Sequence, residues 1–141
     1  MGLEIMLKFK RISFLLILVV CFSCEEQSLF VKCPDCTIEE PVKTQLEIKI
    51  DINNFGANIL ISVYEGNLED SVLYGVFTAV GSHTTFPVSI NKKYTVTAKY
   101  YVPDDFYIVV DSATPRVKYT KDKCDNPCYF VYDRDLDLRL K

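Results

Sequence analysis

Residues 46–52 of the chain read LEIKIDI, a stretch in which apolar and charged side chains alternate without a break. Successive side chains of a β-strand point to opposite faces, so a period of two predicts a strand with one buried and one solvated face. The same alternation returns in YTVTAKY at residues 94–100 and in DLDLRL at residues 135–140. These three stretches predict β-structure throughout the region that follows residue 43.

Further short strands are expected between these stretches, over residues 59–63, 72–78, 84–90, 106–110 and 117–119. Residues typical of turns separate them. Short strands with turn signals at a spacing of about 8–12 residues are typical of a sandwich or barrel. We therefore predict an all-β protein, a single antiparallel β-sandwich that is immunoglobulin-like or transthyretin-like, after an N-terminal signal peptide.

The parity within each strand also predicts the core, because a one-residue slip would turn every apolar side chain of a strand toward solvent. A folded region of about 100 residues has room for one such core and no more. The expected core residues are Leu46, Ile48, Ile50, Ile59, Ile61, Val63, Val96, Ala98, Leu136, Leu138 and Leu140.

Several of these stretches resemble known sandwich domains. Residues 61–66, a strand ending at Thr78, and residues 86–88 and 93–98 are similar to the transthyretin-like domains found as carboxypeptidase regulatory modules and bacterial surface modules. The stretch that begins at Tyr94 also resembles the penultimate strand of fibronectin type III domains. The resemblance supports an immunoglobulin-like class and leaves the topology open, and a fold of this class implies no particular activity.

The N-terminus has the layout of an export signal. Lys8, Lys10 and Arg11 precede an apolar stretch over residues 12–22. This stretch is shorter than the roughly 20 residues that a transmembrane helix needs. We predict a signal peptide over residues 1–23, with Met6 as an alternative start and an uncleaved signal anchor as the competing interpretation.

The end of the apolar stretch resembles the lipobox of bacterial lipoproteins, in which a small residue precedes a cysteine that receives a diacylglyceryl group. Ser23 is the small residue, which makes Cys24 the lipidated position. Cys21 stands where the family usually has Leu, and Phe22 is larger than typical. The resemblance implies that fatty acids such as palmitate anchor Cys24 firmly to a membrane without a spanning helix.

The resemblance to a lipobox also implies the domain boundaries and the cellular location of the protein. A lipid-anchored tether follows over residues 24–43, and the β-sandwich domain extends over residues 44–141. We expect the protein at the outer membrane. Glu25 and Glu26 after the anchor resemble a surface-export signal of some two-membrane bacteria, whereas in others such acids retain a lipoprotein at the inner membrane. A tether that is merely kept solvated by its charges is the third interpretation.

The charge of the chain argues against two classes of partner. The net charge of the whole chain is −3. Cleavage before Cys24 removes three basic residues and one acidic residue, which leaves 13 basic and 18 acidic residues and a net charge of −5. An acidic domain is not expected to bind nucleic acid or to dock electrostatically on anionic lipid.

Four cysteines remain in the exported part, Cys33 and Cys36 before the first strand and Cys124 and Cys128 before the last. In an exported chain an even number of cysteines indicates disulfides. Zinc is the alternative, although zinc sites usually place two such pairs about 15–20 residues apart. All three disulfide connectivities are open. We expect a link between the pairs because an immunoglobulin-like topology brings them to one end, and two local rings are the competing arrangement.

No set of residues has the sequence pattern of a catalytic site. His83 is the single histidine and has no nucleophile beside it. The sequence contains neither a nucleophile elbow nor a Gly-rich phosphate loop. Asp133, Asp135 and Asp137 alternate along a strand, and side chains on one face of a strand cannot wrap a calcium ion. We therefore predict no enzymatic activity, no cofactor and no metal.

One turn is flanked by aromatic residues and forms a candidate binding tip. It comprises Tyr100, Tyr101, Asp104, Asp105, Phe106 and Tyr107. Exposed aromatic side chains at a loop tip can form a binding surface, and cross-strand packing is the alternative explanation. The predicted function is a non-enzymatic, lipid-anchored interaction module of the cell envelope, with an envelope protein or a glycan as partner. A structural subunit resembling lipoprotein pilins is the alternative.

Overall fold

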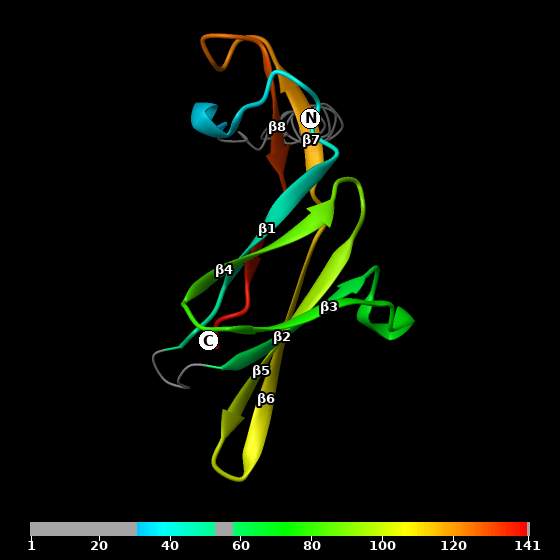
Figure 1. Ribbon diagram of the computed structural model, residues 1–141, viewed down its shortest axis with the longest axis vertical. Helices are drawn as coiled ribbons and strands as arrows, with labels where there is room; N and C mark the ends of the chain where they lie inside the picture. The colour runs from blue at the N-terminus through cyan, green and yellow to red at the C-terminus, as the bar shows by residue number, and fades with distance from the viewer. Residues whose placement is uncertain (1–30, 53–57, 141) are drawn as a thin grey trace, which may run out of the picture. The chain divides into compact units, whose positions relative to one another are not determined.

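The computed structural model describes residues 31–52 and 58–140, which Figure 1 shows as a coloured ribbon. All described residues belong to one compact unit, Val31–Lys141. The predicted signal peptide and the predicted lipidation site Cys24 lie outside the described residues. No helix in the described part of the chain is long and apolar enough to cross a membrane.

Strands dominate this unit, as predicted for an all-β protein. The strands are β1 (Lys43–Lys49), β2 (Ile59–Glu65), β3 (Leu73–Ala79), β4 (His83–Ser89), β5 (Tyr94–Val102), β6 (Asp105–Ala113), β7 (Arg116–Thr120), β8 (Cys128–Tyr132) and β9 (Asp135–Asp137). Two short 3₁₀ helices accompany them, η1 (Cys33–Asp35) and η2 (Leu68–Asp70).

Seven of the strands form two sheets around one core. An antiparallel four-stranded sheet has the order β3-β2-β5-β6, and a three-stranded sheet has the order β4-β1-β9. One cluster of buried side chains contains residues from both sheets. The predicted β-sandwich is therefore confirmed. The remaining strands, β7 and β8, form an antiparallel pair of their own.

The first and last strands of the sandwich pair in parallel, an exception to the antiparallel arrangement that the sequence predicts. Ile48 of β1 lies opposite Leu136 of β9. The strand order also differs from that of immunoglobulin constant domains, where the second strand lies between the first and the fifth. Here β2 lies between β3 and β5. Because they run in parallel, β1 and β9 begin at the same end of the sandwich, and this decides where the cysteines meet.

The strand parity predicted from the sequence is correct for the core. All but one of the eleven expected core residues are buried, and the exception, Leu140, is partly buried against the same cluster. Tyr94 and Tyr100 of β5 add two large side chains that are fully buried. At about 25 cal/mol per Å² of apolar surface, burial of such side chains is the main favourable contribution to folding.

The hydroxyl groups of the two buried tyrosines connect the sheets at their ends. The Tyr100 hydroxyl accepts a hydrogen bond of 3.1 Å from the Asp51 backbone N–H and donates one of 2.6 Å to the Leu138 carbonyl. The Tyr94 hydroxyl accepts one of 3.1 Å from the Ser89 N–H. Each phenol therefore buries its ring in the core and bonds a backbone group at the end of the opposite sheet.

Candidate functional site

Two disulfides join the segment before β1 to the β7–β8 hairpin. Cys33 is bonded to Cys124 and Cys36 to Cys128, with Cα–Cα separations of 5.7 and 5.5 Å. The predicted link between the two cysteine pairs is therefore confirmed, and the two local rings are not formed. We refer to these four residues as the cysteine clamp.

The parallel pairing of β1 with β9 explains why the four cysteines gather. Both strands begin at one end of the sandwich, so the chain segments that precede them approach each other. Thr37 and Tyr129 exchange two backbone hydrogen bonds of 2.8 Å. The Arg134 guanidinium lies 3.4 Å from the Asp35 carboxylate. Residues 33–37 are therefore held against the β7–β8 hairpin by covalent, hydrogen-bonded and ionic contacts.

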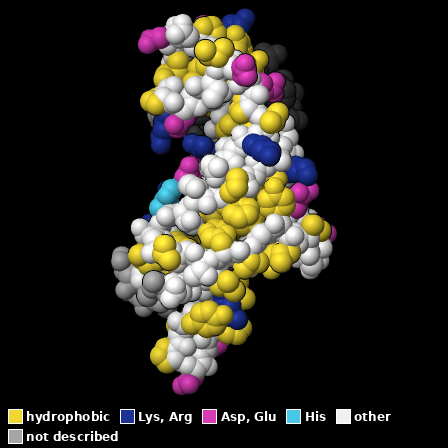
Figure 2. Space-filling view, in the orientation of Figure 1, with side chains coloured by type: hydrophobic (Ala, Val, Ile, Leu, Met, Phe, Trp, Pro, Cys, Tyr) yellow, Lys and Arg dark blue, Asp and Glu magenta, His cyan; other side chains and the backbone are white. Residues whose placement is uncertain are grey.

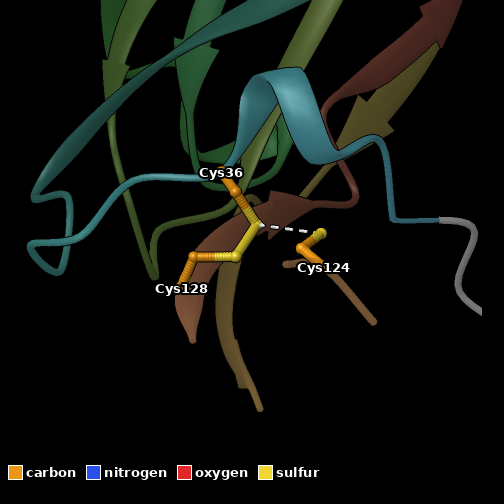
Figure 3. A group of neighbouring side chains, drawn as sticks. All are labelled: Cys36, Cys124 and Cys128. Atoms are coloured by element: carbon orange, nitrogen blue, oxygen red, sulfur yellow. Dashed lines mark hydrogen bonds between the residues drawn. A yellow bond between two sulfur atoms is a disulfide. The ribbon is translucent and has the colours of Figure 1, made fainter. Parts of the chain in front are cut away.

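The sulfur atoms of the cysteine clamp lie close together, as Figure 3 shows for three of them. The Sγ atoms of Cys36 and Cys124 are 3.9 Å apart without being bonded. Those of Cys36, Cys124 and Cys128 lie within 4.8 Å of one another. A metal would need these sulfurs as thiolates, and here each belongs to a disulfide. In this oxidised form the clamp is a covalent staple of the kind that small exported domains use.

The polar residues considered above as candidates for a catalytic or calcium site each interact with a different partner. His83 begins β4, and its Nε2 lies 2.9 Å from the Glu47 carboxylate. The Asp133 carboxylate accepts a hydrogen bond of 3.1 Å from the Thr114 N–H. The Asp137 carboxylate bonds the Arg139 guanidinium at 2.7 Å. These contacts hold turns and strand ends in place, and they do not bring the groups together at one site.

The predicted binding tip is the hairpin between β5 and β6, where Tyr101 lies opposite Phe106. Asp104 turns the chain with a positive φ of 65°, a conformation that aspartate tolerates better than most residues. Tyr101, Phe106 and Tyr107 are exposed. Tyr100 is fully buried in the core and is not part of the exposed tip. The strand alternation explains this difference, because Tyr100 and Tyr101 point to opposite faces of the sheet.

A lysine completes the exposed side of this hairpin. The Lys99 Nζ lies 4.0 Å from the centre of the Phe106 ring and 5.0 Å from that of Tyr101. Figure 2 shows hydrophobic side chains gathered with a basic one on the hairpin that Figure 1 labels β5 and β6. We refer to Lys99, Tyr101 and Phe106 as the aromatic patch. Lys99 was not among the residues predicted for the tip, although it has the same strand parity as Tyr101.

The aromatic patch is one end of a larger surface on the side of the four-stranded sheet that faces away from the core. In the middle of this surface, polar side chains of β5 lie opposite aliphatic side chains of β6, with Thr97 opposite Val110 and Lys99 opposite Ile108. We refer to this surface as the outer face. From β2, β5 and β6 it comprises Leu60, Ser62, Tyr64, Thr95, Thr97, Lys99, Tyr101, Phe106, Ile108, Val110 and Ser112.

A hollow of about 330 Å³ lies at the other end of the outer face, between η2 and β6. Thr95 is buried at this hollow, and its hydroxyl donates a hydrogen bond of 2.7 Å to the Gly66 carbonyl. The Lys93 Nζ donates one of 2.6 Å to the Asn67 side chain. We refer to the hollow as the polar pocket. Its lining residues are Asn67, Leu68, Glu69, Lys93, Thr95, Val110, Asp111 and Ser112.

A hollow of about 390 Å³ lies beside the cysteine clamp, between the segment before β1 and the strand β8. Lys43 lines it together with Arg134, whose guanidinium lies 3.4 Å from the Asp35 carboxylate and 4.0 Å from that of Glu47. The Arg134 cation is therefore already neutralised by two acidic neighbours. This hollow offers less for ligand recognition than the polar pocket does.

The polar pocket was not among the sequence predictions, and no local signal could have revealed it. Glu69 lies in the short helix η2 and Asn67 is its N-cap, whereas Ser112 lies near the end of β6, more than 40 positions later in the chain. Only the folding of η2 beside the sheet brings them together.

The fold and these surfaces define a small, disulfide-linked β-sandwich with an exposed, mixed aromatic and hydroxyl-bearing sheet face. Comparison with known proteins finds no matching family model, no similar curated protein and no similar solved structure.

Proposed function

We propose that the protein is a non-enzymatic, lipid-anchored binding module of the bacterial cell envelope. The observation that carries this proposal is the pair of disulfides that holds a small sandwich together. Disulfides persist in oxidising compartments outside the cytoplasm. The leader and the lipobox-like sequence ending at Cys24 independently support a location outside the cytoplasm.

The outer face is the surface that supports a binding role. Exposed large apolar side chains cluster there, and contiguous exposed patches of this kind mark interaction sites. They lie on a rigid sheet whose opposite side forms the core, so a ligand would meet a preorganised surface. We also infer a transthyretin-like sandwich, because the segments that resemble this family form the neighbouring strands β3, β2 and β5 of one sheet and part of β4 in the other.

Lipidation is the direct test of this proposal. Cells that express the protein with labelled palmitate should incorporate the label into the wild type and into Cys21→Ala, which serves as the matched control. The Cys24→Ala variant should remain unlabelled and leave the membrane fraction or accumulate as precursor. Label in the Cys24→Ala protein, or an unlabelled wild type, would contradict the proposed anchor.

A structural subunit of a surface assembly is the second candidate, and the edge strand β3 favours it. This strand (LYGVFTA) carries neither a charge nor a proline, the devices that commonly protect sheet edges from pairing. In the same chain, the edge strand β4 carries Pro87. Light scattering on the full-length protein in detergent should show oligomers if β3 pairs between copies, and Val76→Lys should dissolve them. A monomer at all concentrations excludes this candidate.

A further inference from the structure

The outer face combines two kinds of surface at a defined spacing. The aromatic patch lies near Tyr101 and the polar pocket near Thr95, six residues apart on the same strand. At roughly 3.3 Å per residue, the two ends are about 20 Å apart. Thr97, Ile108 and Val110 lie between them on the same side of the sheet. A ligand that contacts both ends must therefore be extended.

The aromatic patch provides two exposed rings beside one hydrogen-bond donor. Tyr101 is 57% exposed and Phe106 47% exposed, so both rings are accessible from solvent. One face of a pyranose ring carries mainly C–H groups, and such a face packs on an aromatic ring as an apolar surface does. The ammonium group of Lys99, 4.0 Å from the Phe106 ring centre, is a donor for the oxygen atoms at the sugar's edge.

The polar pocket provides both donors and acceptors within a small volume. The Glu69 carboxylate accepts hydrogen bonds, the Lys93 ammonium donates them, and the Ser112 hydroxyl does both. The Asp111 carboxylate already accepts hydrogen bonds from the Ser112 and Asp137 N–H groups. Sugar hydroxyls both donate and accept hydrogen bonds, so they match this mixture better than a ligand that only donates or only accepts them. The Glu69 carboxylate and the negative net charge of the chain disfavour an anionic ligand.

Two other classes of ligand, a folded protein and an extended peptide, fit the outer face less well. With β3 included, four strands at about 4.8 Å spacing and about 20 Å length cover roughly 400 Å², whereas a stable interface between proteins buries about 800 Å² on each partner. A peptide that extends a sheet pairs with an edge strand, here β3 or β6, and would lie beside the outer face, not on it. Recognition at this face has to proceed through side chains.

We propose that the outer face binds a neutral oligosaccharide, with one sugar unit in the polar pocket and another stacked on the aromatic patch. This inference rests on the proposed function, because it assigns a ligand class to the binding surface of that module.

The inference is tested by calorimetric titration of the full-length protein in detergent with oligosaccharides. The probes are the neutral hexasaccharides of β-1,4-glucose, β-1,3-glucose, β-1,4-xylose, β-1,4-mannose and β-1,4-N-acetylglucosamine, together with the acidic hexamer of galacturonic acid. We expect at least one neutral hexamer to bind with a Kd between micromolar and millimolar, and the acidic hexamer to bind more weakly.

Two variants assign the binding to the two ends of the outer face. The double variant Tyr101→Ala/Phe106→Ala and the pocket variant Ser112→Val should each weaken binding at least tenfold. Tyr119→Ala, which removes an exposed tyrosine of β7, is the matched control and should bind as the wild type does. Thermal unfolding of all variants separates a local loss of binding from a loss of fold.

The outcomes distinguish the two proposals. Failure of every neutral hexamer to bind, preference for the acidic hexamer, or an equal loss in Tyr119→Ala would overturn the oligosaccharide inference. If the protein is nevertheless palmitoylated at Cys24, the envelope module stands and only its ligand class is wrong. If Cys24 is not lipidated but a neutral hexamer binds, the proposed binding surface stands and the proposed lipid anchor is wrong.

Discussion

Tyr100 illustrates how one side chain contributes to both the core and the connection between the sheets. Its ring is fully buried, and its hydroxyl bonds the Asp51 N–H and the Leu138 carbonyl. Tyr101, its neighbour in sequence, is mostly exposed on the opposite face. A single step along β5 therefore separates a structural tyrosine from one available to a ligand.

Removal of the Tyr100 hydroxyl should destabilise the fold. The Tyr100→Phe substitution keeps the ring in the core but removes two hydrogen bonds and leaves backbone groups without these partners. We expect the free energy of unfolding to fall by about 1–3 kcal/mol in urea titrations. Tyr101→Phe, the matched control, should change it by less than about 0.5 kcal/mol. Equal effects of the two substitutions would contradict the structural role of the buried hydroxyl.

The buried tyrosines also predict how stability depends on alkaline pH. Burial raises the pKa of Tyr94 and the pKa of Tyr100 above the ordinary value of 10.0. Above that pH the unfolded chain loses phenolic protons that the folded protein retains, so the free energy of unfolding decreases as pH rises. Below the ordinary pKa of tyrosine, both states keep these protons and the stability is not reduced. Urea midpoints should therefore decline between about pH 9 and pH 11, and less steeply in Tyr94→Phe/Tyr100→Phe. An unchanged slope in the double variant would refute this origin.

At the scale of the strand, β2 contributes side chains to both faces of the four-stranded sheet. It lies between β3 and β5, and Ile59, Ile61 and Val63 all point into the core. The side chains on its other face belong to the outer face. Alternate side chains of β2 therefore stabilise the core, and those between them belong to the proposed binding surface.

Truncation on the two faces of the four-stranded sheet should have very different effects. Ile61→Ala removes buried methyl and methylene groups and leaves a cavity, so we expect a loss of about 2–5 kcal/mol in the free energy of unfolding. Ile108→Ala is the matched control, because the Ile108 side chain on β6 is 54% exposed. It should cost less than about 1 kcal/mol. Chemical denaturation of both variants provides the comparison, and a similar loss in each would argue against the strand parity.

At the scale of the whole molecule, the cysteine clamp closes the domain on itself. Each disulfide links positions 91 or 92 residues apart, so each restricts nearly the whole folded unit in the unfolded state. The two links are also neighbours along the chain at both of their ends. Once one is formed, the other closes only the small ring between the pairs.

This arrangement predicts that the two disulfides do not contribute additively to stability. In the loop-entropy model, the first crosslink over 91 residues contributes about 4–5 kcal/mol, and the second, which closes a short ring, about 2–3 kcal/mol. Replacing either pair alone by serines should therefore cost the smaller amount. Replacing both should cost more than twice as much. Denaturant titrations of the two double variants and the quadruple variant measure this difference, and equal, additive costs would contradict the model.

Local sequence determined most of the framework of this protein. Alternation in 46–52, 94–100 and 135–140 predicted the strands and the residues that point into the core, because side-chain direction in a strand depends only on parity. The even number of cysteines, together with the predicted export signal, indicated disulfides but left their connectivity open. The aromatic residues of the β5–β6 hairpin were also visible in the sequence.

Only the tertiary structure decided how these parts meet. The parallel pairing of β1 with β9 selects the links Cys33–Cys124 and Cys36–Cys128 from three possible connectivities. The polar pocket forms because η2 lies beside the sheet near Ser112. Contacts between residues so far apart in the chain depend on how the strands are ordered in the two sheets. No local pattern encodes that order, because every strand carries the same period of two and several pairings would bury the same apolar faces.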